Sequence, residues 1–338
     1  MCRTILKTEA LAFRWEVEDP FLFCAHHKDN YPKGNTEFGP PEESLKNRNI
    51  GNDFEIRDGF RMYHEKKVPG LPTHPHRGFE TITIVLEGFV DHSDSHGAAG
   101  RYGDGDVQWM TAGSGLQHAE MFPLLNQNKD NPLHLFQVWL NLPKEDKFTE
   151  PYYKMLWAED IPVIDEVDNH GKKSTVRLIA GKYKNHKALD PAPASWAYDE
   201  NNHVNIWIIG MEPNSTFRIP KVKNTITRNT YYYKGDKLEI NRDSVNSGNR
   251  FKLNGNEDID IVNGDKQSFM LLLEGEPIDE PVVAYGPFVM NTMEEIKQAY
   301  ADFRVTQFGG WPWDRNDPIH TNEKVRFAKY SDGTLEKR

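Results

Sequence analysis

The chain has 338 residues, a formal net charge of -10 and 37% hydrophobic residues, a length that allows two ordinary domains or one large all-β unit. The negative charge and the lack of a basic stripe argue against direct binding of nucleic acid, whose phosphates require a positive surface. No apolar run approaches the ~20 residues of a membrane helix, so we expect no membrane binding either.

The first twenty residues and the cysteine content predict the cellular compartment. The N-terminal segment has no continuous apolar stretch and no small-residue cleavage site, so we expect no secretory signal. The two cysteines, Cys2 and Cys24, are too few for a disulfide framework. Both features favour a reducing, cytoplasmic location.

Short β-branched or aromatic runs, bounded by Gly, Pro, Asn and Asp, recur along the chain and predict an all-β protein. Regularly spaced strands of this kind are typical of a sandwich or barrel. Residues 28–59 interrupt the pattern with Pro, Gly, Asn and charge, and we interpret them as a lid-like loop over one face. The predicted strands span residues 79–86, 106–110, 134–142, 204–209, 229–233 and 267–273.

Repeated local patterns predict two similar units. Gly-Asp occurs at 105–106 and 264–265, each time before an apolar strand, and Leu-Glu-Gly occurs at 86–88 and 273–275. Such repetition indicates a duplicated barrel. Charge rises and strands pause around residues 143–150. We therefore expect one domain at 1–148 and a second at 149–338.

One helix is predicted near the C-terminus. Thr292 and Glu295 fit a capping box, in which each side chain accepts a hydrogen bond from the other residue's backbone N–H. Ile296, Tyr300 and Phe303 follow at helical spacing and form a packing face. We assign this helix and the charged tail after it to the second domain.

Four potential metal ligands lie in the first half of the chain. His74 and His76 are two residues apart, and His118 and Glu120 repeat that spacing. Residues i and i+2 of a strand point to the same face, so two neighbouring strands would bring the four side chains together. Three imidazoles and a carboxylate suit Fe, Mn, Ni, Cu or Zn better than Ca or Mg. The small residues at 112–115 allow a tight turn beside the ion.

Other interpretations stay open at this point. A lone pair of histidines at this spacing also occurs by chance on protein surfaces. His92 and His96 lie close by, but the segment around them has the composition of a polar loop, so we expect neither to bind metal. Phe79 and Trp109 flank the ligand segments and are candidates to line a substrate pocket, although packing in the barrel core explains them equally well.

Three segments carry a family resemblance: THPHRGFETITIVLEG from residue 73, GDVQWMTAGSGLQHAEM from residue 105 and EPVVAYGPFVMNTMEEI from residue 280. They resemble the pirin family of the cupin superfamily, and the likeness extends over most of the chain. The resemblance implies a bicupin, with two double-stranded β-helix barrels and one metal ion in the first barrel only. The family's ligands fall on His74, His76, His118 and Glu120, whereas Glu80, the general cupin glutamate, is not used.

The second barrel lacks a corresponding pair of histidines. Its equivalent strands carry Thr216, Arg218 and Ser268. We therefore expect no second metal site there, and family habit implies a monomer.

The resemblance implies two functions of different classes. One is a quercetin 2,3-dioxygenase, in which Fe(II) holds a flavonol and Glu120 acts as the catalytic base. The other is an iron-dependent, redox-sensing regulator that binds protein partners without turnover. The open positions of a four-ligand metal site favour the enzyme.

Overall fold

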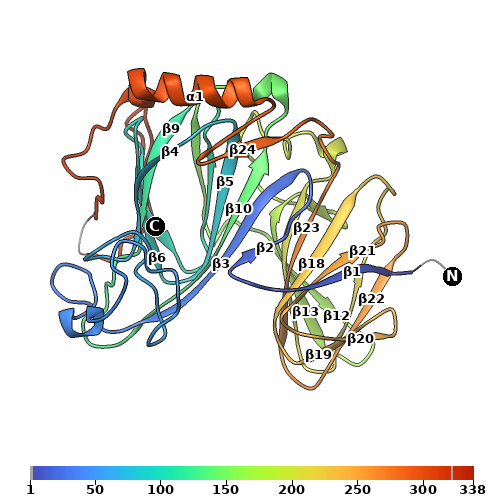
Figure 1. The fold of residues 1–338 in the computed structure, drawn as a ribbon. Coiled ribbons are helices and arrows are strands. Elements are labelled where there is room, and N and C mark those ends of the chain that lie inside the picture. Colours follow the sequence, from blue (N-terminus) through green and yellow to red (C-terminus); the bar gives the residue numbers. More distant parts are fainter. Residues whose placement is uncertain (1–2, 321–322) are drawn as a thin grey trace. The chain divides into compact units, whose positions relative to one another are not determined.

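The computed structural model describes residues 3–320 and 323–338, and these form two compact units. The histidine unit comprises residues 26–158 and 280–338, and the second unit comprises residues up to 25 and 159–279. Both are built from antiparallel strands, as Figure 1 shows. The predicted all-β architecture with one C-terminal helix is confirmed. No helix in the described ranges is long and apolar enough to cross a membrane.

The two units are interleaved along the sequence instead of following one another. The chain passes between them after Ala25, after Ala158 and after Asp279. Strand β1 (Ile5–Ala10) therefore belongs to the second unit, where it pairs with β21 (Asn249–Leu253). The C-terminal segment belongs to the histidine unit, although we expected it with the second half of the chain.

Two six-stranded sheets, with the orders β11-β8-β5-β10-β3-β2 and β27-β26-β7-β6-β9-β4, supply the strands of the histidine unit. Strand β2 and the first five residues of β3 fall within the residue range of the second unit. Strand β5 lies inside the first sheet, and its residues from Phe79 to Val85 are all buried because both faces are covered. The strands of these sheets are β2 (Arg14–Trp15), β3 (Phe21–Tyr31), β4 (Gly70–His76), β5 (Phe79–Glu87), β6 (Phe89–Asp94), β7 (Ala99–Gly103), β8 (Val107–Thr111), β9 (Leu116–Met121), β10 (Asn131–Asn141), β11 (Tyr152–Leu156), β26 (Phe327–Lys329) and β27 (Leu335–Lys337).

The second unit has a seven-stranded sheet, β1-β21-β18-β23-β16-β13-β12, and a four-stranded sheet, β17-β22-β19-β20. Their inner faces share one apolar core, which includes Trp207, Phe251 and Met270. Cys24 is buried with a free thiol, whereas Cys2 lies outside the described residues. The strands not yet given are β12 (Val163–Val167), β13 (Lys173–Ala180), β14 (Lys182–Tyr183), β15 (His186–Lys187), β16 (Asn205–Met211), β17 (Thr216–Ile219), β18 (Thr227–Lys234), β19 (Lys237–Ile240), β20 (Asp243–Asn246), β22 (Ile259–Asn263) and β23 (Ser268–Gly275).

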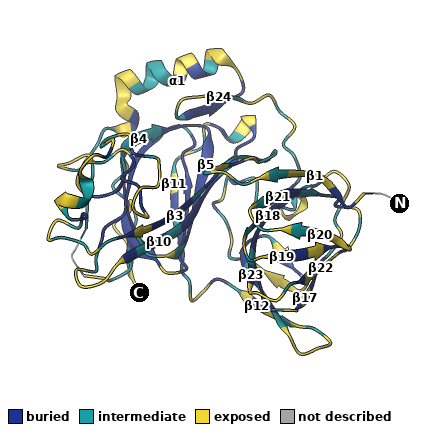
Figure 2. Ribbon diagram, turned by 60° about the horizontal axis from the view of Figure 1, so that its bottom comes forward, coloured by how far each residue is buried: buried dark blue, intermediate teal, exposed yellow. Residues whose placement is uncertain are grey.

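Helix α1 (Met293–Thr306) begins with the predicted capping box. Oγ1 of Thr292 accepts from the backbone N–H of Glu295, whose carboxylate accepts from the backbone N–H of Thr292. The buried face of α1 packs on the short strands β24 (Val283–Tyr285) and β25 (Phe288–Met290). In Figure 1 the helix runs across the end of the histidine unit near β4 and β9, and Figure 2 shows its outer face exposed.

Residues 28–59, which we predicted as a lid-like loop, begin as regular structure, because β3 continues to Tyr31. A single 3-10 turn, Glu42–Leu45, lies within the rest. Buried ion pairs hold this stretch in place. Nη2 of Arg61 lies 2.9 Å from Oδ2 of Asp29, and Nη1 of Arg48 lies 3.0 Å from Oδ2 of Asp53. Such pairs require specific partners once they leave water, so they fix the path of the segment.

Candidate metal centre

Strand β9 lies between β4 and β6 and determines which side chains meet. His118 of β9 is directly opposite His74 of β4, and Glu120 is directly opposite His92 of β6. Opposed residues of antiparallel strands share a face, as do residues two apart on one strand. The period-two spacing of the sequence therefore places these side chains on one face of the sheet.

The three predicted histidine ligands converge there. Their ligating nitrogens lie within 4.8 Å of one another, and no other group of this kind occurs among residues 3–320 and 323–338. The ring centroid of His118 lies 4.4 Å from that of His74 and 5.0 Å from that of His76. His76 and His118 are buried, whereas His74 is half-buried.

Hydrogen bonds orient two of the three rings. Nδ1 of His74 lies 2.8 Å from the carbonyl oxygen of Pro72, and Nδ1 of His76 lies 3.1 Å from that of Pro287. Each bond leaves Nε2 available, which is the usual arrangement of a histidine that binds metal. Both ring nitrogens of His118 are buried and have no hydrogen-bond partner among the described residues. Buried polar atoms rarely stay unpaired, so this donor set fits a transition-metal ion.

Burial also sets the protonation state of these rings. Loss of solvation lowers the pKa of His74 to about 4, and it lowers the pKa of His76 and of His118 well below the ordinary value. All three imidazoles are therefore neutral near pH 7. Only the neutral ring offers a lone pair to a metal, so the site is ready to bind without prior loss of protons.

Glu120, the fourth predicted ligand, lies at the edge of this group. Its Oε2 is 3.9 Å from Nε2 of His118 and accepts a hydrogen bond from Gln137 at 2.5 Å, while Oε1 accepts from Thr83 at 3.1 Å. Burial raises the pKa of Glu120, and His92, Gln137 and Thr83 partly oppose that rise. The carboxylate is thus held beside the imidazoles and is more basic than an exposed one.

The segment around His92 is not the polar loop that its composition predicts. Residues 89–94 form β6, and both His92 and Asp94 are buried in it. The rings of His92 and His118 are 5.6 Å apart, and Nε2 of His92 lies 3.2 Å from Oδ2 of Asp94. His92 and Asp94 repeat the two-residue spacing of the ligand pairs, and that spacing was the signal that could have identified a strand here.

The two predicted pocket residues lie in different places. Phe79 lies beside the histidines, with its ring centroid 5.0 Å from that of His76 and 4.3 Å from that of Trp139. Trp109 is opposite Ile82 on the other face of β5, where its Nε1 donates to Glu80 at 3.1 Å. The structure therefore brings Phe79, but not Trp109, to the histidine group.

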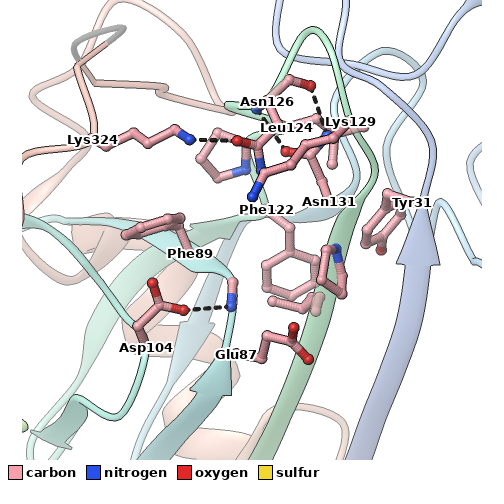
Figure 3. A pocket seen from close by; sticks show the side chains of 14 residues that line it. Tyr31, Glu87, Phe89, Asp104, Phe122, Leu124, Asn126, Lys129, Asn131 and Lys324 are labelled. Carbon is pink, nitrogen blue, oxygen red and sulfur yellow. Dashed lines mark hydrogen bonds between the residues drawn. The ribbon is translucent and has the colours of Figure 1, made fainter.

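A cavity of about 310 Å³ lies at the end of the same barrel, just after β9 (Figure 3). Its polar groups largely pair with one another. The Asp104 carboxylate accepts from the backbone N–H of Gly88 at 3.1 Å, and Asn126 bonds to both Asn131 and Lys324. We assign no ligand to this cavity.

The comparisons with known proteins agree with the arrangement of both units. Residues 14–140 match the Pirin family, and residues 206–309 match the Pirin C-terminal cupin domain. A Pseudomonas aeruginosa protein provisionally named quercetin 2,3-dioxygenase is 37% identical over 243 residues, which cover 71% of this chain and 79% of that protein. Human pirin is 35% identical over 277 residues, which cover 78% and 87% of the two chains. A crystal structure of quercetin 2,3-dioxygenase from Acinetobacter baumannii gives a TM-score of 0.70 at 27% identity and covers 91% of this chain and 98% of that one.

Proposed function

The chain belongs to the pirin family, and we propose that it is a metal-dependent dioxygenase that cleaves a flavonol such as quercetin. One observation carries this proposal: three neutral, mutually close imidazoles lie beside the buried carboxylate of Glu120. The relatives named quercetin 2,3-dioxygenase support it.

The metal would be held by the ring nitrogens of His74, His76 and His118, with Glu120 as the fourth ligand. We propose Fe(II), and the same donors also suit Mn, Ni, Cu or Zn because divalent affinities overlap. When bound, such an ion acts as a Lewis acid toward the flavonol oxygens and lowers the barrier to oxidation.

Glu120 is the proposed base for the flavonol 3-hydroxyl. Its raised pKa makes the carboxylate a better proton acceptor. Thr83 and Gln137 donate hydrogen bonds to its two oxygens and so fix its position. A base positioned in this way contributes about 10²–10⁴-fold to rate. The proton transferred from the substrate ends on a carboxylate oxygen of Glu120.

Aromatic walls beside the histidines favour a planar substrate and exclude water. Phe79 and Trp139 are in ring contact with each other, and each also contacts His76. Exclusion of water strengthens electrostatic interactions inside the site and protects a deprotonated flavonol from reprotonation by solvent. In the overall reaction one quercetin and one dioxygen give one depside and one carbon monoxide.

The test is quercetin-dependent oxygen uptake by protein reconstituted anaerobically with Fe(II). We expect uptake by the native chain and by His170→Ala, which removes an exposed histidine of the second unit. We expect none from His74→Ala. Absence of uptake from native protein that binds one iron per chain would overturn the proposal and favour the redox-sensing regulator.

A further inference from the structure

A cavity of about 580 Å³ lies entirely within the second unit, which contributes none of the three clustered histidines. It is enclosed by the β14–β15 hairpin, by the start of β16 and by the loop at residues 220–223. Its volume falls in the ~300–1,000 Å³ range of small-molecule sites.

Trp207 forms part of the cavity wall and has an unpaired donor. The residue is 3% exposed, and its Nε1 has no hydrogen-bond acceptor among the described residues. Its ring packs edge-on against Tyr183, which also lines the cavity, at a centroid distance of 5.2 Å. Buried indole N–H groups usually have an acceptor, so this one indicates a ligand atom that accepts a hydrogen bond.

A second unpaired donor lies next to the cavity lining. Arg228 forms a buried ion pair with Glu274 at 2.5 Å and donates to the carbonyl oxygen of Pro220 at 2.8 Å, and both partners line the cavity. Nη1 of Arg228 is buried and has no acceptor in the part of the chain that the structure describes. Glu274 also accepts from Asn205 at 2.7 Å, so its carboxylate is already satisfied. Two buried donors, Nε1 of Trp207 in the lining and Nη1 of Arg228 next to it, thus have no acceptor among the described residues.

Two lysine side chains at the rim of the cavity are not held in ion pairs by any described residue, although acidic residues such as Asp199 also line it. Five lysines line it, and three of them, Lys182, Lys184 and Lys187, form ion pairs with acidic side chains. The side chains of Lys221 and Lys223 form no ion pair within residues 3–320 and 323–338, and both are exposed, while the backbone N–H of Lys221 donates to Asp258 at 2.8 Å. This charge favours a ligand with an anionic group at the mouth.

We propose that this cavity binds a planar aromatic carboxylate that carries a second hydrogen-bond acceptor. The aromatic body lies against Trp207 and Tyr183, and the acceptor meets Nε1 of Trp207. The carboxylate faces Lys221 and Lys223. Binding here requires no metal and is independent of the function proposed for the histidine unit.

The experiment uses 6-hydroxy-2-naphthoate as the probe and follows the indole ¹⁵N–¹H signals of the eight tryptophans of the full chain. Comparison with Trp207→Phe assigns the Trp207 signal. We expect the probe to shift that signal in native protein, and to do so with the same affinity in His74→Ala. An unshifted Trp207 signal at saturation, or loss of binding in His74→Ala, would overturn the proposal.

Charge variants test the rim independently of Trp207. We expect Lys221→Gln/Lys223→Gln to weaken binding by roughly three- to tenfold, because exposed charge pairs contribute modestly. The control Lys172→Gln/Lys237→Gln removes two exposed charges of the same unit that do not line the cavity. Its affinity should equal that of native protein, and equal weakening by both double variants would contradict a specific site.

Discussion

At the scale of single residues, two buried glutamates show how the face of a strand determines function. Glu80 and Glu120 are both almost fully buried. Glu120 lies on the face that carries the histidines, whereas Glu80 lies on the opposite face of β5 and accepts from Trp109 and from Thr111. Because successive residues alternate faces, the neighbouring position Thr81, and not Glu80, is on the side of Phe79 and Thr83.

This pair gives a matched test of the base. We expect Glu120→Gln to lower quercetin turnover by about 10²–10⁴-fold, because the amide cannot accept the hydroxyl proton. Iron content, measured in the same samples, separates loss of the base from loss of the ion. Glu80→Gln should retain turnover within a few-fold. Full activity of Glu120→Gln would contradict the proposed base.

The sequence predicted the clustered residues with uneven success, and the reason is physical. His74, His76 and His118 follow from period-two spacing on strands that happen to be neighbours. Trp109 was a pocket candidate with core packing as its alternative, and it lies on the other face of β5 from Phe79, because sequence distance does not show which face a residue occupies. The strand that holds His92 was wrongly predicted as a loop, because Asp, Ser and Gly beside it are typical of loops, although pairing with β9 makes the segment a strand.

At the scale of elements, the connection between β4 and β5 depends on a close approach of β25. Gly78 has φ 86°, and a Cβ there would lie 2.0 Å from the carbonyl oxygen of Val289. The carbonyl of Pro287, just before β25, holds His76. The sequence indicated turns from its glycines and the helix from its capping box, but contact between residues so distant in sequence depends on tertiary packing.

We therefore expect Gly78→Ala to displace β25, destabilise the histidine unit and weaken metal binding. The positive φ alone costs about 1–2 kcal/mol for alanine, and the clash adds roughly 1–3 kcal/mol. Gly97→Ala is the control, since Gly97 has φ 82° and no atom of the described residues outside its own chain neighbours lies within 4 Å of the added Cβ. Chemical denaturation and metal titration measure both effects. Equal losses in the two variants would exclude a role for the close approach.

At the scale of the whole molecule, each of the two units is built from two separate stretches of the sequence. The strand β1 at the N-terminus completes the sheet of the second unit, whereas β26 pairs with β7 in the histidine unit. Composition and periodicity predicted the class and the duplication correctly, and the family resemblance is confirmed. Composition and periodicity carry no information on which distant strands pair, so the interleaving of the two units along the sequence could not be predicted.

Because the two units are interleaved along the sequence, we predict that residues 1–148 do not fold alone. This fragment lacks β24 to β27 and α1 of the histidine unit, and its β1 lacks its partner β21. Without them, the surface at Gly115, against which the ring of Phe308 lies in the full chain, stays exposed. We expect the fragment to give no dispersed amide spectrum, in contrast to the full chain. A folded, metal-binding fragment would refute this account of the units.

The stability of the metal-free protein should fall below pH 6.5. Burial lowers the pKa of His27 to about 3, so the unfolded chain binds its proton at a higher pH than the folded chain does. The free energy of unfolding is therefore highest above pH 6.5, and it falls progressively as pH decreases toward 3, because the unfolded chain takes up the His27 proton first. From pH 7 to pH 5 we expect a loss of about 1–2 kcal/mol from this residue. His27→Gln should show a correspondingly smaller drop in urea denaturation, and an identical drop would contradict this assignment.

The proposed dioxygenase activity is tested most directly by the stoichiometry of its gaseous product. Quercetin is added anaerobically to the Fe(II)-loaded chain, dioxygen is admitted, and carbon monoxide is measured against dioxygen consumed. The account predicts one carbon monoxide released per dioxygen consumed by the native chain. It predicts neither dioxygen consumption nor carbon monoxide release by His118→Ala. Consumption of dioxygen without carbon monoxide, or an equal yield from His118→Ala, would contradict flavonol cleavage at the three histidines.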